Sequence, residues 1–222
     1  MIEIYSPNMI KTFISCPKKY YYKYIENISA PQSSLPFEKG KKIHALANYY
    51  LQGINIEKLE KTLNEKERQA WTLLKENEFY NKEYFKSEFQ ISAKVSKYWV
   101  GGRIDAIVKD GGKYYILDYK TGSTPKNPEY DFQTMIYFIC ADKFLKNYDS
   151  LFFVYINLKD KNNYIIEFTP QMKNLYEKKI IEICNQISTS NIYPSACKEC
   201  AADLLADTDN TPVFCEYKKL CL

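Results

Sequence analysis

Two adjacent segments that read as the strands of one β-hairpin constrain the fold of this chain more than any other feature. They are residues 102–108 (GRIDAIV) and 115–122 (YILDYKTG), and between them lies the sequence Asp-Gly-Gly at 110–112. That sequence is typical of a tight hairpin turn. In the first strand every second residue from 104 to 108 is apolar, so Asp105 is expected to point away from the apolar face.

The second strand brings a lysine to the same place. Asp118 and Lys120 are two residues apart and should point to one face, while Leu117 and Tyr119 point to the other. Two carboxylates beside an ammonium are costly to assemble, because like charges repel and burial penalises each charge. A divalent cation would remove that repulsion and leave the lysine free to polarise water or phosphate. Asp105, Asp118 and Lys120 therefore form the minimum set for metal-assisted hydrolysis of a phosphodiester.

Other polar residues lie at suggestive spacings outside the hairpin. A helix predicted at about residues 131–145 carries Gln133 and Tyr137, which are four residues apart and share one face. The only histidine of the chain, His44, closes the sequence Gly-Lys-Lys-Ile-His at residues 40–44, also in a predicted helix. An Asp-x-Lys triplet alone carries little weight in a chain with 26% charged residues, so its neighbours decide its meaning.

The order of these segments resembles the PD-(D/E)xK nuclease superfamily, and within it the RecB-like exonucleases. This branch includes the nuclease domains of RecB and AddB and small CRISPR-associated nucleases with an iron–sulfur cluster. The resemblance covers nearly the whole chain: its segments are Ser6 to Ile10 with Phe13 and Cys16-Pro17, Gly40 to His44, Gly102 to Asp105, Asp118 to Gly122, Gln133 to Tyr137 and the C-terminal cysteines. It implies an α/β fold with a restriction-endonuclease-like core, a central mixed sheet flanked by helices, with a helical N-terminal part and a cysteine-rich C-terminal tail.

The resemblance also implies a metal centre. His44, Asp105 and Asp118 would bind Mg²⁺ or Mn²⁺, with the backbone carbonyl of Tyr119 as a further ligand. For His44, the alternative is an ordinary packed or surface side chain.

Three more residues receive catalytic roles from the same resemblance. Lys120 would orient the attacking water and help to deprotonate it. Gln133 and Tyr137 would brace Lys120 or hold the DNA backbone. The alternatives are a surface amide for Gln133 and a core aromatic for Tyr137, in a chain with 21 tyrosines.

The cysteines fall into two groups. An odd count, with no signal peptide in the first residues, argues against a disulfide scaffold and for metal ligation or burial. Two lie in apolar surroundings and are predicted to be small core residues, and the other five are candidates for metal ligation. The first group is Cys140 and Cys184, and the second is Cys16, Cys197, Cys200, Cys215 and Cys221.

Thiolates at the spacing of the second group suit zinc or an iron–sulfur cluster. Many RecB-like nucleases bind a 4Fe–4S cluster through one N-terminal and three C-terminal cysteines, which implies Cys16, Cys215 and Cys221 as ligands here. Residues 201–214 look like an insertion relative to that pattern, so the fourth ligand is Cys200, with Cys197 as the alternative. The type stays open among 4Fe–4S, 2Fe–2S and zinc. A cluster would hold both terminal segments around the core and turn metal-binding energy into folding energy.

A length of 222 residues fits one domain, 1–222. We divide it into a helical N-terminal part (1–80), a catalytic core (86–170), and a C-terminal helix with the metal-cluster tail (171–222). Ser6 should cap the first helix, with Pro7 as its first residue. Further helices are expected at 56–77 and 171–187, and strands at 88–95, 98–108, 114–120, 151–157 and 164–168.

The net charge of +4 is too small to attract nucleic acid strongly, so any electrostatic attraction must come from local clusters of basic residues. Lys18, Lys19 and Lys23 interleave with Tyr20 and Tyr24, a composition that can hold a phosphate backbone and stack bases of single-stranded DNA. The alternative is that the tyrosines pack on the core while the lysines are solvated. The sequence has no ATPase phosphate-binding loop, so a helicase, recombinase or CRISPR integration partner would be a separate protein. The oligomeric state stays open.

These features predict a metal-dependent DNA exonuclease that acts on single-stranded ends in recombination, repair or DNA processing, with a structural iron–sulfur cluster. One alternative is a CRISPR adaptation nuclease of the same family. The other is a DNA-end-binding module with little cleavage activity. No apolar run reaches the ~20 residues of a membrane span, so we expect no membrane association and a cytoplasmic location.

Overall fold

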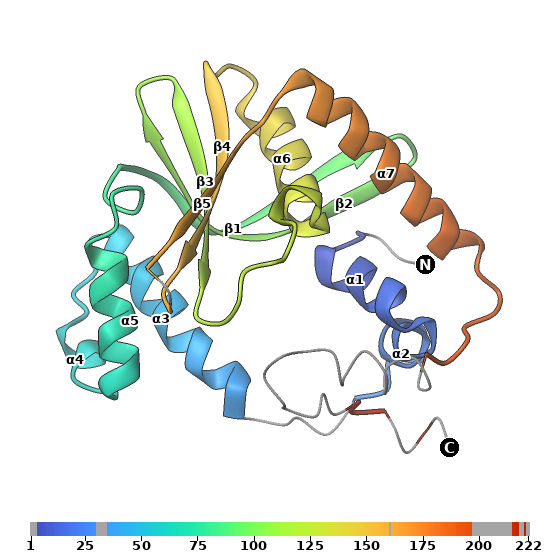
Figure 1. The fold of residues 1–222 in the computed structure, drawn as a ribbon, viewed down its shortest axis with the longest axis horizontal. Coiled ribbons are helices and arrows are strands. Elements are labelled where there is room, and N and C mark those ends of the chain that lie inside the picture. The colour runs from blue at the N-terminus through green and yellow to red at the C-terminus, as the bar shows by residue number, and fades with distance from the viewer. Residues whose placement is uncertain (1–3, 30–34, 160, 197–214, 218–219, 221–222) are drawn as a thin grey trace.

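The computed structural model describes residues 4–29, 35–159, 161–196, 215–217 and 220, without the side chains of residues 35–39 (Figure 1). Helices come first, a five-stranded sheet follows, and one helix crosses over between strands. In chain order the elements are α1 (Pro7–Ser15), α2 (Pro17–Tyr20), the π-helix η1 (Tyr21–Ile25), α3 (Leu35–Leu51), α4 (Glu57–Glu60), α5 (Glu65–Lys75), β1 (Glu83–Val95), β2 (Tyr98–Asp110), β3 (Lys113–Lys120), the 3₁₀ turn η2 (Pro128–Tyr130), α6 (Phe132–Leu145), β4 (Ser150–Asn157), β5 (Asn163–Glu167) and α7 (Pro170–Thr189).

The sheet is mixed, and its strands lie in sequence order from β1 to β5. β3 and β4 are parallel, and the other neighbouring pairs are antiparallel. A parallel pair needs a crossover connection, and α6 supplies it. Helices cover the sheet on both sides (Figure 1). The α/β fold with a restriction-endonuclease-like core, predicted from the sequence, is confirmed.

Two clusters of buried side chains fill the two faces of the sheet. The first cluster joins α1, α6 and α7 to the sheet, and Phe138 and Tyr176 are among its fully buried members. The second joins α3 and α5 to the opposite face and includes Leu46 and Trp71. Because both faces are buried, the strands of the centre carry apolar residues on both sides.

The alternation predicted for the first hairpin strand is therefore wrong in one respect. Ile104 belongs to the first cluster, but Ala106 belongs to the second, so the regular alternation breaks at Asp105. The β1–β2 register on either side places Glu88 opposite Asp105, and Glu88 has a φ angle of 44°. A left-handed backbone costs a non-glycine residue about 1–2 kcal/mol, and such strain is concentrated at functional sites.

The single helix predicted at 56–77 is two helices, α4 and α5. The first helix ends at Glu60, and Asn64 caps the second. The Asn64 side chain accepts from the backbone N–H of Glu67, and the Glu67 carboxylate accepts from the N–H of Asn64. This capping box is readable in the sequence as Asn-x-x-Glu. Leu59, expected on the apolar stripe, is exposed.

The caps of α1 and α6 fix the helices that meet near the sheet. The Ser6 hydroxyl accepts from the N–H of Met9 at 3.2 Å, with Pro7 as the first helical residue, as predicted. Ile10 is buried, whereas Ile14 on the same helix is exposed. Asp131 caps α6 by accepting from the N–H of Gln133 at 2.8 Å.

The described C-terminal residues dock on α2, η1 and the segment that follows them. The Tyr22 hydroxyl donates to the carbonyl of Leu220 at 2.6 Å, and Lys19 Nζ lies 3.3 Å from Glu216 Oε1. The Tyr217 hydroxyl donates to the carbonyl of Ile28, and its ring is almost fully buried. Among the described residues, no helix is both long and apolar enough to span a membrane.

Candidate active site

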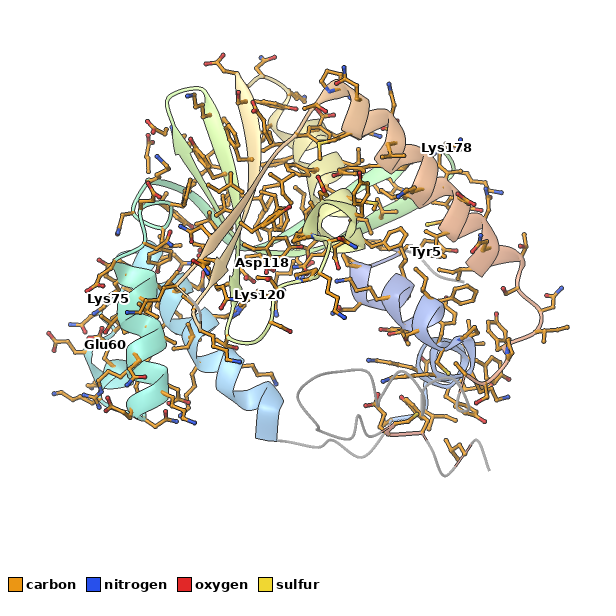
Figure 2. The ribbon with its side chains drawn as sticks, in the orientation of Figure 1. Tyr5, Glu60, Lys75, Asp118, Lys120 and Lys178 are labelled. Atoms are coloured by element: carbon orange, nitrogen blue, oxygen red, sulfur yellow. The ribbon has the colours of Figure 1, made fainter. Side chains whose placement is uncertain are left out.

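Asp118 and Lys120 lie together near the end of β3 (Figure 2). Lys120 Nζ is 2.8 Å from Asp118 Oδ2, while Leu117 and Tyr119 pack into the second cluster on the other face. Asp118 is only 5% exposed. Burial raises the pKa of Asp118, and the nearby Asp105 carboxylate raises it further, against the opposing effect of Lys120.

Gln133, in the first turn of α6, lies between these two charges. Its amide Nε2 donates to Asp118 Oδ1, and its Oε1 accepts from Lys120 Nζ at 3.4 Å. The Lys120 ammonium also lies over the Tyr155 ring, 5.6 Å from its centre. The ammonium thus has a defined position, with a carboxylate, an amide oxygen and an aromatic face around it.

His44 of α3 faces the same region from the other side. Its Nδ1 lies 3.1 Å from Asp105 Oδ1, and its Nε2 lies 3.2 Å from the Tyr119 carbonyl oxygen. Asp105 Oδ2 in turn accepts from the Tyr119 N–H at 2.9 Å. Burial lowers the pKa of His44, but the hydrogen bond to Asp105 and the surrounding carboxylates outweigh it and raise the pKa overall.

Tyr137 lies one helical turn after Gln133 but contacts a different group. Its hydroxyl donates to the Arg103 carbonyl at 2.8 Å, and its ring lies against Gly102, where an added Cβ would be 2.9 Å from the hydroxyl oxygen. Tyr137 therefore supports the β2 backbone next to Asp105. Its hydroxyl bonds Arg103 and not Lys120, and its expected role of bracing Lys120 or holding the DNA backbone stays a prediction.

Glu88 is a member of the site that the sequence analysis missed. Ligand atoms of His44, Glu88 and Asp105 all lie within 4.8 Å of one another. Arg103 Nε, 2.9 Å from Glu88 Oε2, pairs with the same carboxylate. The sequence feature that could have identified Glu88 is the tight turn after Val95. This turn fixes the β1–β2 pairing and so places Glu88 opposite Asp105.

The side chains fit a hard divalent cation. Carboxylate and carbonyl oxygens with one imidazole are donors that Mg²⁺ and Mn²⁺ accept. Asp118 Oδ2 is buried, and its charged neighbour is the Lys120 ammonium, 2.8 Å away. The Lys120 ammonium offsets the desolvation of this carboxylate only in part, because the pKa of Asp118 stays raised, so a further cation beside the two carboxylates would be stabilising. Asp118 is not part of the His44, Glu88 and Asp105 group and is held by Lys120 and Gln133 instead.

The structure removes Tyr20 from the base-stacking surface expected in the basic and aromatic segment after Cys16. Tyr20 is fully buried and packs against Phe13 and Tyr193, so neither face of its ring is open to a base. Tyr24 is half-buried against Tyr20. The lysines have neighbours in the protein: Lys18 lies over the Tyr21 and Tyr22 rings, Lys19 pairs with Glu216, and Lys23 lies over Tyr24. For Tyr20 the alternative, a tyrosine packed on the core, is what the structure shows, and DNA binding by the lysines and Tyr24 stays a prediction.

Cys16 is buried at the junction of α1 and α2, where its sulfur accepts from the Lys19 N–H at 3.4 Å. Cys140 and Cys184 are core residues, as predicted, and burial raises the pKa of each thiol to about 12. Cys215 is half-buried in the segment that docks near α2. Cys197, Cys200 and Cys221 lie outside the described residues.

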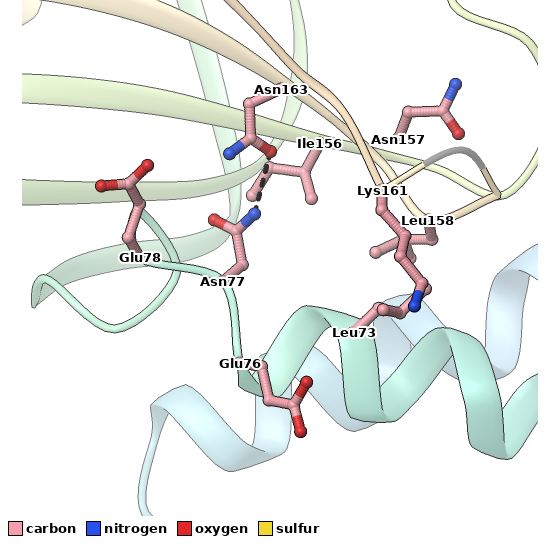
Figure 3. Close-up of a pocket in the computed structure, with 9 residues that line it drawn as sticks. All are labelled: Leu73, Glu76, Asn77, Glu78, Ile156, Asn157, Leu158, Lys161 and Asn163. Atoms are coloured by element: carbon pink, nitrogen blue, oxygen red, sulfur yellow. Dashed lines mark hydrogen bonds between the residues drawn. The ribbon is translucent and has the colours of Figure 1, made fainter.

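A pocket of about 300 Å³ lies apart from this site, between the end of α5 and the β4–β5 turn (Figure 3). Asn77 and Asn163 join across it by a 2.9 Å hydrogen bond. None of the predicted site residues lines it.

Comparison with known proteins agrees with this geometry. The family model described as "PD-(D/E)XK nuclease superfamily" matches residues 4–221. A curated relative from Francisella tularensis subsp. novicida (strain U112), named CRISPR-associated exonuclease Cas4, is 23% identical over 214 residues, which cover 96% of this chain and 91% of the relative. A crystal structure of a Eubacterium rectale protein superposes with a TM-score of 0.59 at 12% identity, covering 96% of this chain and 91% of that one, which shows that the fold is shared.

Proposed function

The chain belongs to the PD-(D/E)XK nuclease superfamily, and we propose that it is a metal-dependent DNA exonuclease that acts on single-stranded ends. The observation that carries this proposal is the pairing of the buried Asp118 carboxylate with Lys120 at 2.8 Å, next to the His44–Asp105 contact. A lysine and two carboxylates held at one point by a hairpin match the chemistry of phosphodiester hydrolysis. The relative named as an exonuclease supports the RecB-like branch.

The metal ligands proposed are His44, Asp105, Asp118 and the carbonyl of Tyr119, with Glu88 as an added carboxylate. The His44 imidazole already contacts both the Asp105 carboxylate and the Tyr119 carbonyl oxygen. When bound, Mg²⁺ or Mn²⁺ would neutralise the carboxylates and polarise the phosphodiester as a Lewis acid.

Lys120 carries the chemistry that belongs to the chain itself. It would orient the attacking water and help to remove its proton, and its charge would stabilise the negative charge that develops on the phosphate oxygens. Water adds to phosphorus as the bond from phosphorus to the 3′ oxygen breaks, and that oxygen takes up a proton. The products are a 5′-phosphate and a 3′-hydroxyl. Gln133 would hold the Lys120 ammonium and the Asp118 carboxylate in position during this step.

The proposal includes a structural 4Fe–4S cluster bound by Cys16, Cys200, Cys215 and Cys221, with Cys197 as the alternative to Cys200. Two observations support it: Cys16 is buried without a disulfide, and residues 215–217 and 220 dock on the helices that follow it. Zinc or a 2Fe–2S cluster would use the same thiolates.

Lys18, Lys19 and Lys23 would contribute to DNA binding through the phosphate backbone, with no contribution from Tyr20. Lysines that contact the phosphate backbone act mainly by charge, so their effect should decline as salt rises.

A second candidate function is trimming of DNA before its integration in CRISPR adaptation. The Francisella relative, named CRISPR-associated exonuclease Cas4, favours this candidate. The chemistry would be the same, so the genes that neighbour this one would discriminate it. Neighbouring integration proteins would favour CRISPR adaptation, and their absence would favour general repair or recombination.

The proposal is tested by digestion of single-stranded DNA labelled at the 5′ or the 3′ end, beside a circular single strand, with Mn²⁺, Mg²⁺ or EDTA. We expect metal-dependent loss of the linear strands only, with the position of the label giving the polarity. Cutting of circles would add an endonuclease activity. If DNA is bound but not cut with either metal, the chain is an end-binding module instead.

A further inference from the structure

Asp131 joins two helices at the edge of the site. It is the N-cap of α6, and its Oδ1 accepts from the Gln133 N–H at 2.8 Å. Lys11 Nζ of α1 lies 2.7 Å from the same oxygen. One carboxylate atom therefore holds both the first turn of α6 and a cation from a helix near the start of the chain.

This contact continues directly into the catalytic residues proposed above. The backbone of Gln133 is fixed by Asp131, and its side chain reaches both Asp118 and Lys120. A small rotation of the first turn of α6 would move the Gln133 amide away from one of these partners. The position of the Lys120 ammonium thus depends on how firmly Asp131 is held.

The surroundings of the Lys11–Asp131 ion pair favour a contribution to the position of α6. The Asp131 side chain is 13% exposed and that of Lys11 is 38% exposed, so the pair is partly screened from water. A fully exposed pair contributes little, whereas a partly buried and well-directed pair contributes more. The helix that carries Lys11 is itself anchored by Ile10, which is fully buried in the first cluster.

The geometry points to Lys11 and Asp131 as positioning residues for catalysis: Lys11 restrains the Asp131 cap, which keeps the Gln133 amide between Asp118 and Lys120. The inference rests on the proposed nuclease function and extends it to residues that do not touch the substrate or the metal. It predicts a loss in kcat without a matching loss in substrate binding.

The chain offers a matched control on the same helix. Lys173 of α7 lies 2.8 Å from Asp142 Oδ2, near the other end of α6, with side-chain exposures of 41% and 17%. That pair resembles the Lys11–Asp131 pair in length and exposure, but it lies far along α6 from Gln133. A general loss of helix docking should therefore affect both pairs equally, and a positioning role only the first.

The experiment compares Lys11→Met, Asp131→Asn and Lys173→Met in steady-state cleavage of end-labelled single-stranded DNA with Mn²⁺, together with the melting temperature of each variant. Asparagine still caps a helix, so Asp131→Asn removes the charge and keeps the cap. We expect Lys11→Met and Asp131→Asn to lower kcat about fivefold with KM within about twofold of wild type. Lys173→Met should keep the wild-type kcat at a similar melting temperature, and Lys11→Arg should restore most of the activity.

A double-mutant cycle separates positioning from simple destabilisation. In a Gln133→Ala background, Lys11→Met should change kcat by less than about twofold, because the residue through which it acts is gone. If Lys11→Met behaves like Lys173→Met, or if its effect multiplies with that of Gln133→Ala, the inference fails while the nuclease function stands. If the wild-type protein cleaves no DNA with either metal, the proposed function fails and this inference falls with it.

Discussion

At the scale of single side chains, Asp118 occupies an electrostatically unfavourable position. It is nearly fully buried, a second carboxylate faces it, and one ammonium and one amide compensate for this only in part. Removing one partner of such a group leaves a buried charge without compensation, which costs more than the pair contributes. The proposed metal explains why the chain keeps this arrangement.

His44 predicts how metal binding depends on pH. Its pKa is raised above 6.5 in the folded metal-free protein, so protonated His44 stabilises that state at low pH, and the stabilisation is lost as the pH rises through the raised pKa. A metal ion needs the neutral imidazole, and protons compete with it. Calorimetry with Mn²⁺ between pH 6 and 8 should show affinity rising with pH by up to about tenfold per unit. His44→Gln should bind more weakly and flatten that dependence; a wild-type affinity independent of pH would exclude His44 as a ligand.

Glu88 tests the composition of the metal site. Glu88→Gln keeps the shape of the side chain but removes its charge, and Mn²⁺ affinity measured by calorimetry should fall by about tenfold or more. Glu83→Gln is the control, because Glu83 lies on the same strand in an exposed ion pair with Lys109. Equal affinity in the two variants would mean that Glu88 serves only to pair with Arg103.

The sequence predicted that Asp118 and Lys120 lie together, because side chains two residues apart on a strand point to the same face of the sheet. It did not predict Glu88, whose position depends on pairing between strands. Tyr20 shows a further limit, because a lysine-tyrosine alternation looks the same whether its rings are buried or exposed. Burial depends on the partners that pack on the helix, which local sequence does not reveal.

At the scale of elements, the β1–β2–β3 meander positions the carboxylates, and its break in alternation at Asp105 turns that side chain toward His44. The strand positions and the two-residue turn after Asp110 follow from local sequence, and most predicted ranges agree with the structure within a few residues. The break between α4 and α5 was missed, although the Asn64 capping box was present in the sequence.

Gly101 tests how closely these strands pack. A Cβ at this position would overlap the Ile91 carbonyl oxygen and Ser92, which are backbone and neighbouring atoms with little freedom to move. Gly101→Ala should lower the free energy of unfolding by about 1–3 kcal/mol or more, measured by urea denaturation. Gly122→Ala is the control, since a Cβ added at Gly122 would meet no other atom within 4 Å among the described residues. Equal stability of the two variants would contradict the packing described.

At the scale of the whole molecule, the C-terminal segment that contains Tyr217 and Leu220 docks on the residues that follow Cys16, and the proposed cluster would fasten it there. Local sequence shows that the cysteines exist, but the choice between Cys197 and Cys200 depends on chain geometry that spacing alone does not fix. Metal binding of this kind contributes directly to folding.

Cys16→Ser should therefore lose iron and visible absorbance in anaerobically purified protein, and its melting temperature should fall. Cys184→Ala is the control, because Cys184 is a core thiol outside the proposed ligand set. Iron content equal to wild type in Cys16→Ser would remove Cys16 from the ligand set. Zinc in place of iron in the wild-type protein would change the type of centre but not its position.

The most direct test of the account is the single-turnover rate of Mn²⁺-dependent cleavage of linear single-stranded DNA by Lys120→Met, measured beside Lys82→Met. Lys82 Nζ lies 2.9 Å from Asp110 Oδ2, and Asp110 is at the opposite end of the β2–β3 hairpin from Lys120. Lys82→Met therefore controls for the loss of a lysine charge. We predict that Lys120→Met lowers the rate by about 10²-fold or more while still binding DNA, and that Lys82→Met cleaves like wild type. Equal cleavage by Lys120→Met and wild type would contradict the assignment of this site as the catalytic centre.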